Sequence, residues 1–435
     1  MSIRKWFSFV IIMICVGCSV MNHDLKVFDK NNPDIRVLVM DSSPEVVFIT
    51  QTAWVVTDYD ADESMNLPEN TEVLLFVEDE KVVAISTEGT LKAHGLIFDS
   101  KQKNGTVQIR KSGGKQGHTY EGRIEVHKGA DGMPEIIISL PMEEYLKGVI
   151  PYEIGPASPL AAQCAQAVAA RSEAYVALVT RKYAGERYDI CSSVQCQVFR
   201  GNERRSERSD HAVELTRGHI LMFDGEPISA YYASTCGGHM EDIRNVWPHR
   251  AGEKAYWGAA GFDGDDNLNL DLSNEDDFRK WLHMSPGVWC NPEFSDIPNW
   301  THKNFRWTRD VDAADLTEWI AEHKDIGRVI ALKPLKRGVS GRLIELEFVG
   351  QKGSVVISPE LKIRRVFKPG LRSAAFVVDI SGSKDRPDQF IIQGAGSGHG
   401  VGMCQVGAIG MANAGKSFKE ILEHYYPKAE IEKLY

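Results

Sequence analysis

Short apolar runs separated by turn residues dominate the first third of the chain. They are rich in Val, Ile, Leu and Phe, a composition and length typical of antiparallel strands. The predicted strands cover residues 35–39, 46–49, 54–56, 73–77, 82–85, 106–109, 120–126 and 135–140. No carboxylate pair or metal-ligand spacing stands out among them. We therefore expect residues 35–139 to form a β-rich N-terminal domain with a packing role.

After residue 140 the apolar positions follow a helical period instead. A short helix is predicted over residues 142–149 and a long Ala-rich helix over residues 159–182, with Ser158 as its N-cap and Pro159 at its first position. The long helix should bury one stripe, formed by Leu160, Ala167, Val168, Tyr175, Leu178 and Val179. Glu153 lies between the helices, in a loop punctuated by Pro and Gly. A carboxylate that leads into a buried helix is typical of an acid/base catalyst.

The rest of the chain mixes both patterns. We expect a hairpin of residues 220–223 and 228–233 around Asp224-Gly225, a strong turn signal. Further strands are predicted at residues 343–349, 354–357, 376–380 and 389–392, and helices at 210–216, 313–323, near 359, 409–414 and 418–425. Residues 394–408 carry Gly at nearly alternate positions, which predicts a tight loop that presents His399. The acidic, Trp-containing residues 263–304 are expected to be a surface insertion.

These patterns predict an α+β fold. A mostly antiparallel β N-terminal part is followed by a mixed α+β core over residues 140–435, built around the long Ala-rich helix. The chain has 435 residues, of which 43% are hydrophobic and 25% charged, an ordinary globular composition. Its net charge of -10 argues against a general nucleic-acid binder, which would be basic.

The N-terminus has the features of a targeting segment. Arg4 and Lys5 precede an apolar run over residues 6–16, which is too short to span a bilayer. Gly17-Cys18 then resembles a bacterial lipoprotein signal, with Cys18 as the lipidated residue; an ordinary cleaved signal peptide is the alternative. We expect residues 1–18 to be the signal and residues 19–34 a polar tether. The mature protein would then be lipid-anchored to a membrane in the cell envelope, outside the cytoplasm.

Six motifs occur in order along the remaining chain: LPMEEYLKGVIPYEIG, AQAVAARSEAY, CQVFRG, YYASTCGGH, GHGVGMCQVGAIGMANAG and ILEHYYPKAEI. Together they resemble the SpoIID/LytB family, named for sporulation stage II protein D. The resemblance implies a lytic transglycosylase, which cleaves the β-1,4 bond between N-acetylmuramic acid and N-acetylglucosamine of peptidoglycan and leaves a 1,6-anhydro end. Related members are amidase enhancers, so a non-catalytic wall-binding scaffold that assists a cell-wall amidase is the alternative.

The family's essential acid matches Glu153. Most glycosidases use two carboxylates, but here the muramic acid C6 hydroxyl is an internal nucleophile, so one carboxyl can act as acid and then as base. Glu153 must start protonated, which partial burial would favour. No cofactor is required for this chemistry.

The same motifs place polar residues around the proposed cleft. Gln166 and Arg171 are expected to hold sugar substituents or orient Glu153, with a structural role inside the helix packing as the alternative. Gln197, His399 and Gln405 match polar positions of the family, although the His399 imidazole could instead be satisfied by backbone. The remaining wall of the cleft is expected from Ser234, Gly237 and Gly238.

The cysteines leave several possibilities open. Cys191 and Cys196 flank four residues, and some family members bind zinc with such a pair; a structural zinc completed by Cys236 and His239 or His399 and a disulfide are both possible. The family often has Lys at the position of Cys164 and Ser at that of Cys404. A further alternative is a cysteine hydrolase that uses Cys404 or Cys164 with His399.

Overall fold

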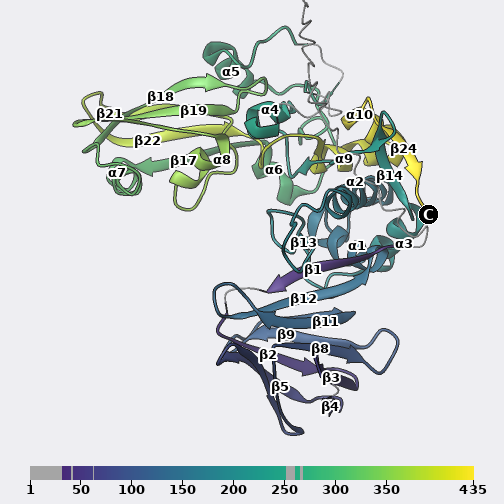
Figure 1. Cartoon of the computed structure of the whole chain (residues 1–435). Helices are drawn as coiled ribbons and strands as arrows, with labels where there is room; N and C mark the ends of the chain where they lie inside the picture. The colour runs from purple at the N-terminus through teal and green to yellow at the C-terminus, as the bar shows by residue number, and fades with distance from the viewer. Residues whose placement is uncertain (1–31, 41–42, 62, 251–259, 265–267) are drawn as a thin grey trace, which may run out of the picture.

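The structure is a computed structural model that describes residues 32–40, 43–61, 63–250, 260–264 and 268–435. It is an α+β protein with three lobes, and the chain returns from the third lobe to the second for its last two helices (Figure 1). We call them the β lobe (strands β1–β12), the helical lobe (α1–α3, α9 and α10) and the distal lobe (β17–β22 with α7 and α8). The predicted signal, including Cys18, and nearly all of the predicted tether lie outside the described residues.

Two mostly antiparallel sheets form the β lobe. One has the order β13 (Ile190–Cys191), β1 (Asp34–Met40), β12 (Pro134–Pro141), β11 (Arg123–Lys128), β8 (Gly95–Ser100), β3 (Trp54–Asp58), β4 (Ser64–Leu67). The other has the order β10 (Gly117–Glu121), β9 (Thr106–Lys111), β2 (Glu45–Thr50), β5 (Glu72–Glu78), β6 (Lys81–Ser86), β7 (Gly89–Ala93). Their inner faces meet in a shared core, where the rings of Phe48 and Phe98 lie 5.0 Å apart.

The strand predicted over residues 120–126 is divided between the two sheets. Gly122 separates β10 from β11 and has a φ of 102°, where a Cβ would lie 2.6 Å from the Ser139 carbonyl oxygen. Only Gly tolerates this corner. The predicted Asp224-Gly225 turn is present, with φ of 50° and 75°.

The helical lobe is built around α2. Helix α1 (Met142–Glu153) follows β12 directly, and α2 (Leu160–Val179) is covered by α1, α3 (Glu207–Leu215), α9 (Gln405–Asn413), α10 (Phe418–Tyr425) and β14 (His219–Phe223). Because neighbours surround α2, its residues 162–174 are all buried instead of one stripe, and Leu160 is 36% exposed. Ser158 is not the N-cap: Pro159 takes that position, because its ψ of 145° lies outside the helical range, and the Ser158 hydroxyl donates to the Ile154 carbonyl.

Two small sheets complete the helical lobe. β14 lies between β15 (Glu226–Pro227) and β24 (Glu430–Lys433). The second strand of the predicted hairpin is therefore short, and the chain then forms β16 (Tyr232–Ala233), which pairs in parallel with β23 (Met403–Cys404). This pairing brings the YYASTCGGH segment beside the Gly-rich loop. In that loop Gly396, Gly398, Gly400 and Gly402 all have positive φ, which confirms the tight turning predicted from sequence.

The distal lobe has its own core. One sheet joins β17 (Arg306–Asp312), β22 (Arg386–Ala395) and β21 (Phe376–Ser383), and the other joins β18 (Val329–Arg337), β19 (Leu343–Gly350) and β20 (Gly353–Ile357). Helices α7 (Ala313–Ala321) and α8 (Glu360–Val366) pack on these sheets.

The segment that connects the helical and distal lobes is not the surface insertion predicted from sequence. It holds α4 (Ile243–Val246), a 3-10 turn (Pro248–Arg250), α5 (Glu275–Leu282) and α6 (Asn299–Phe305). Phe278, Trp281 and Cys290 in this segment are almost fully buried in the main core. The acidic residues that suggested exposure include the first turn of α5, where they favour the positive end of the helix dipole.

Candidate functional site

Glu153 lies at the C-terminal end of α1 and not in the loop predicted for it, because the helix continues through Pro151. Its Oε1 accepts the backbone N–H of Val198 at 2.7 Å, and its Oε2 lies 3.4 Å from the amide nitrogen of Gln405. Residues from three distant parts of the chain therefore fix the carboxyl. It has one strongly bound oxygen and one more loosely held oxygen.

The environment of Glu153 favours its protonated form. Burial raises the pKa of Glu153 above its usual value, although the hydrogen bonds from Val198 and Gln405 act in the opposite direction. The C-terminal end of a helix also disfavours a negative charge, because the last carbonyl groups point toward it. The raised pKa is the property required of a general acid.

Two hollows meet at Glu153. One has a volume of about 480 Å³ and is lined by Glu153, Tyr232, Trp247 and His399 among others. The other has a volume of about 760 Å³ and contains Glu153, Ser234, Trp300 and Gln405 in its lining. A polymer that followed both hollows would pass over the carboxyl, with aromatic side chains on each side of it.

Gln405 and Gln166 extend the contacts of the carboxyl. The Gln405 amide nitrogen also donates to Oε1 of Gln166, at 3.1 Å. Gln166 is fully buried, whereas Gln405 reaches the larger hollow. The structure thus places Gln166 behind Gln405, where it holds Gln405 in position.

His399 lines the same hollow as Glu153 and is a neutral imidazole near pH 7. Its Nδ1 accepts the N–H of Val401 at 3.0 Å, and its ring packs against Trp247 at 5.0 Å between centroids. Burial, with the nearby Arg342 and Arg364 guanidinium groups, lowers the pKa of His399 to about 3. The imidazole is therefore neutral, and it is held by backbone while it faces the hollow.

The other expected substrate-binding residues lie outside both hollows. Arg171 forms a buried bidentate ion pair with Glu143, at 2.9 and 2.7 Å, so it has the structural role left open as its alternative. Gln197 is fully buried and bonds to Tyr145 and to the Tyr232 hydroxyl. Gly237 and Gly238 pack against the Gly-rich loop and Trp281 instead of forming a wall of the cleft, because added Cβ atoms would meet Gly396 and Trp281 at 2.7 Å.

Comparison with known proteins divides the chain in two. Residues 130–223 match the family described as "Stage II sporulation protein", and residues 242–402 match the family described as "Domain of unknown function (DUF8618)". This match and the named relatives support a SpoIID/LytB-type family for the chain. The SpoIID match includes Glu153 and Gln166, whereas His399 lies in the second match and Gln405 lies beyond both.

Three relatives are similar over much of the chain. An uncharacterized protein of Brachyspira hyodysenteriae is 28% identical over 362 residues, which cover 83% of this chain and 82% of the relative. The amidase enhancer of Bacillus subtilis is 28% identical over 293 residues, 65% of this chain but only 39% of the relative. Stage II sporulation protein D of Bacillus amyloliquefaciens is 25% identical over 368 residues, which are 77% of this chain and 90% of that protein.

Sequence reasoning missed two polar groups beside Glu153. Glu173 of α2 and Tyr232 of β16 both line the smaller hollow with Glu153. Glu173 lies seven residues after Gln166, so a helical wheel centred on Gln166 would have placed both on one face of α2. The sequence carries no comparable periodic signal for Tyr232, because its position depends on the pairing of β16 with β23.

The Cys191 and Cys196 pair does not form part of a complete set of zinc ligands in the described residues. Its sulfur atoms lie 2.6 Å apart, and a tetrahedral zinc needs two further ligands beside them. Within the described part of the chain, no third His, Cys, Asp or Glu joins the pair. His239 points its Nδ1 at its neighbour's carbonyl, and Cys236 belongs to a different cluster.

The geometry also removes the support for a cysteine hydrolase. Cys164 and Cys404 are both almost fully buried. The Cys404 sulfur accepts the N–H groups of Cys236 and Gly407, whereas the Nδ1 of His399 accepts the N–H of Val401.

Among the helices of the described residues, none has the length and apolar character that a membrane-spanning helix needs.

Proposed function

We propose that this chain is a peptidoglycan lytic transglycosylase with Glu153 as its single acid/base. The observation that carries the proposal is the Glu153 carboxyl, whose pKa is raised by burial, at the junction of two hollows. A glycan strand in these hollows would place its scissile β-1,4 bond at the carboxyl. The names of its SpoIID-type relatives agree with a role at the cell wall.

In the proposed reaction Glu153 first donates a proton. Because Val198 holds Oε1, we assign the proton to Oε2, from which it passes to the oxygen that bridges the two sugars. The bond between that oxygen and C1 of N-acetylmuramic acid breaks. The resulting carboxylate then takes the proton of the C6 hydroxyl as its oxygen attacks C1. The products are the 1,6-anhydro sugar and a free 4-hydroxyl, and Glu153 is protonated again without consumption of water.

Glu173 is the obvious second carboxyl for a hydrolase, and its surroundings argue against that role. Its Oε1 lies 3.8 Å from the Lys182 ammonium, and the side chain is 10% exposed. A hydrolase would use this carboxylate to activate water opposite the general acid.

The amidase enhancer among the relatives supports one alternative function, a non-catalytic scaffold that binds wall strands and assists a cell-wall amidase. The same hollows would then hold a glycan without cleavage. This activity would need no proton on Glu153 and would leave no anhydro ends.

The products of glycan digestion decide between these functions. The full chain is incubated with purified strands, with and without stem peptides, and the products are identified by mass spectrometry. We expect anhydro ends from the wild-type protein and at least about a 100-fold lower rate for Glu153→Gln, because general acid–base catalysis contributes that much. Reducing ends would indicate hydrolysis instead, and an undiminished rate in Glu153→Gln would remove the proposal.

Two controls separate lost chemistry from lost folding. Glu69→Gln makes the same change on the surface and should keep the full rate. Glu153→Gln should be at least as thermostable as the wild type at neutral pH. A carboxyl with a raised folded pKa contributes its full stability only below its usual pKa and loses it as the pH rises through the folded value. If no strand is cleaved but an added amidase becomes faster, the scaffold function applies.

We further propose that the protein acts in the cell envelope, anchored by lipid at Cys18. Its partners would be glycan strands, the membrane through this anchor and a cell-wall amidase, with no nucleic acid. Growth with a radioactive fatty acid tests the anchor: the wild-type protein should become labelled, and Cys18→Ser should not.

A further inference from the structure

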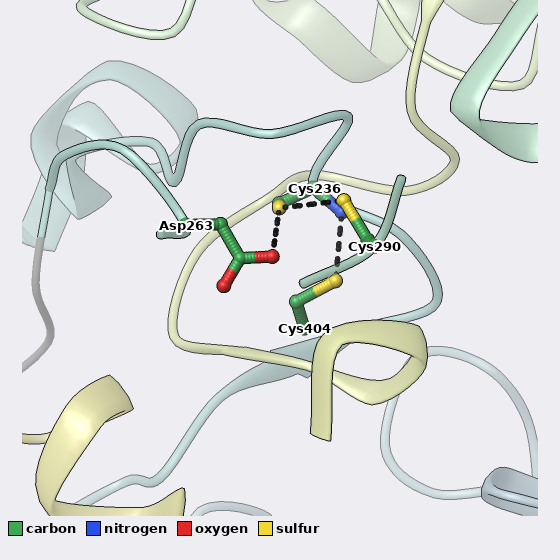
Figure 2. Close-up of side chains that lie close together, drawn as sticks. All are labelled: Cys236, Asp263, Cys290 and Cys404. Carbon is green, nitrogen blue, oxygen red and sulfur yellow. Dashed lines mark hydrogen bonds between the residues drawn. The ribbon is translucent and has the colours of Figure 1, made fainter. Parts of the chain in front are cut away.

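Four buried side chains converge in the helical lobe at a place that the proposed reaction does not use. They are Cys236 after β16, Asp263, Cys290 between α5 and α6, and Cys404 at the end of β23 (Figure 2). Each is at most 3% exposed, and one ligand atom from each lies within 4.8 Å of all the others. Segments separated by more than a hundred residues thus direct three sulfur atoms and one carboxylate oxygen at a common point.

The spacing of these atoms suits one small metal ion. The sulfur atoms of Cys236 and Cys290 are 3.6 Å apart, and the Cys236 sulfur is 3.2 Å from Oδ2 of Asp263. Ligands on a tetrahedral zinc lie at about 2.3 Å for sulfur and about 2.0–2.2 Å for oxygen, which places neighbouring ligands about 3.5–3.8 Å apart. Only small side-chain adjustments would be needed to bring all four ligands onto the same ion.

The groups around the cluster are those of a built site. Backbone N–H groups of Cys236 and Gly407 donate to the Cys404 sulfur, and that of Gly238 donates to the Cys236 sulfur, at 3.2–3.3 Å. Such donors stabilise thiolates. They leave the sulfur lone pairs on the inner side available to a metal.

Asp263 is also oriented from behind. Its Oδ1 accepts the Tyr425 hydroxyl at 2.8 Å and lies 3.2 Å from Nε2 of His424, while Oδ2 faces the sulfurs. Outer contacts of this kind fix the direction of a ligating carboxylate in metal proteins.

Two guanidinium groups, of which Arg342 is buried and Arg306 partly buried, lie close enough to offset negative charge. Arg306 donates to the carbonyl of Gly237, next to Cys236, at 2.9 Å, and Arg342 donates to the Cys236 carbonyl at 3.1 Å. Three thiolates and a carboxylate would carry four negative charges, of which a divalent ion neutralises two. The nearby arginines reduce the cost of burying the remaining charge.

We propose that Cys236, Asp263, Cys290 and Cys404 bind a structural zinc ion. Sulfur-rich tetrahedral ligand sets select zinc among the common divalent metals, and four protein ligands leave no open position for substrate. The ion would tie the connection between the lobes to the start of α9. Cys404 immediately precedes Gln405, so the same ion would hold the amide that contacts Glu153.

Metal analysis of the full chain, prepared without chelator, tests the site. We expect about one zinc ion per chain in the wild type and in Cys164→Ser, a buried cysteine outside the cluster. Cys191→Ser/Cys196→Ser should also keep the ion, whereas Cys290→Ser and Asp263→Asn should lose most of it. A zinc content that falls in Cys191→Ser/Cys196→Ser but stays unchanged in Cys290→Ser and Asp263→Asn overturns the proposal.

Spectroscopy covers the case in which the ligand variants do not fold. X-ray absorption at the zinc edge of Cys191→Ser/Cys196→Ser should give three sulfur neighbours and one oxygen neighbour, and cobalt substitution should give the visible bands of a tetrahedral thiolate site. A zinc shell without sulfur contradicts the assignment. So does a disulfide between two of Cys236, Cys290 and Cys404, detected by peptide mapping of freshly prepared protein.

Discussion

The protonation of Glu153 sets the pH dependence that we expect for glycan cleavage. Burial raises the pKa of this carboxyl above its usual 4.5, and only its protonated form can act as the acid. Activity should therefore be highest on the acidic side and fall as the pH rises through the raised pKa. Measured as kcat/KM against pH, the profile should contain one descending limb with its midpoint above 4.5.

Neighbouring residues provide the controls for this limb. Gln405→Ala should move the midpoint to higher pH, since its hydrogen bond lowers the pKa of Glu153, whereas Gln351→Ala on the surface should not move it. The pKa of His399 is lowered to about 3, so the limb should persist in His399→Gln. A midpoint that moves to lower pH in Gln405→Ala, or a limb that disappears with His399, would contradict this assignment.

Single residues were predictable from sequence where a local motif defines them and not where a distant partner does. The P-x-E pattern before a small-residue helix, together with the family resemblance, selected Glu153 as a candidate. Arg171 and Glu173 lie two residues apart in that helix, and both are polar residues in an apolar context. Only the fold shows that Arg171 forms an ion pair with Glu143, whereas Glu173 lines a hollow.

Helix α1 and the loop of residues 196–201 together determine the position of the Glu153 hydrogen bond. A Cβ at Gly148 would lie 2.4 Å from the Phe199 ring, and Phe199 follows Val198, the donor to Glu153. We expect Gly148→Ala to destabilise the fold by about 1–3 kcal/mol through overpacking. It should also lower the cleavage rate, because the loop must shift. Denaturant unfolding and product analysis measure both effects.

A second substitution checks that crowding is the cause. Phe199→Leu makes room beside residue 148, so the double variant should be more stable than the sum of the single effects predicts. In a helix without such a neighbour, Gly→Ala would instead stabilise by up to about 1 kcal/mol. A stabilised single variant would therefore show that the loop yields without cost.

Elements were predictable where their apolar pattern was strong. Helix α10 was predicted with its observed bounds, and β5, β6 and β19 were placed within one residue or two. β4, β7 and β8 were missed because they are short or begin with Gly and lack regular alternation. The core contribution of α5 was missed because its charges outnumber Phe278 and Trp281, and burial depends on which face meets a neighbour.

Two separate hydrophobic cores organise the whole molecule. The main core runs without a break from the β lobe through the helical lobe and includes Val377 of β21 and Ala395 of β22, whereas the remaining buried apolar residues of the distal lobe enclose a second core. Contacts between α5 and the distal lobe include ion pairs of Arg279 with Asp379 and of Arg337 with Glu275. Polar contacts of this kind couple two units less strongly than a shared apolar core does.

The two cores lead us to expect two unfolding transitions in scanning calorimetry. Phe348 is fully buried in the second core and Phe98 is 1% exposed in the main one. Truncation of a buried Phe to Ala costs about 3–5 kcal/mol of stability. Phe348→Ala should therefore lower the midpoint temperature of one transition and leave that of the other nearly unchanged. Phe98→Ala should instead lower the midpoint temperature of the other transition, in which the part of the chain around Glu153 unfolds. A single transition that both variants shift equally would show that the lobes unfold as one unit.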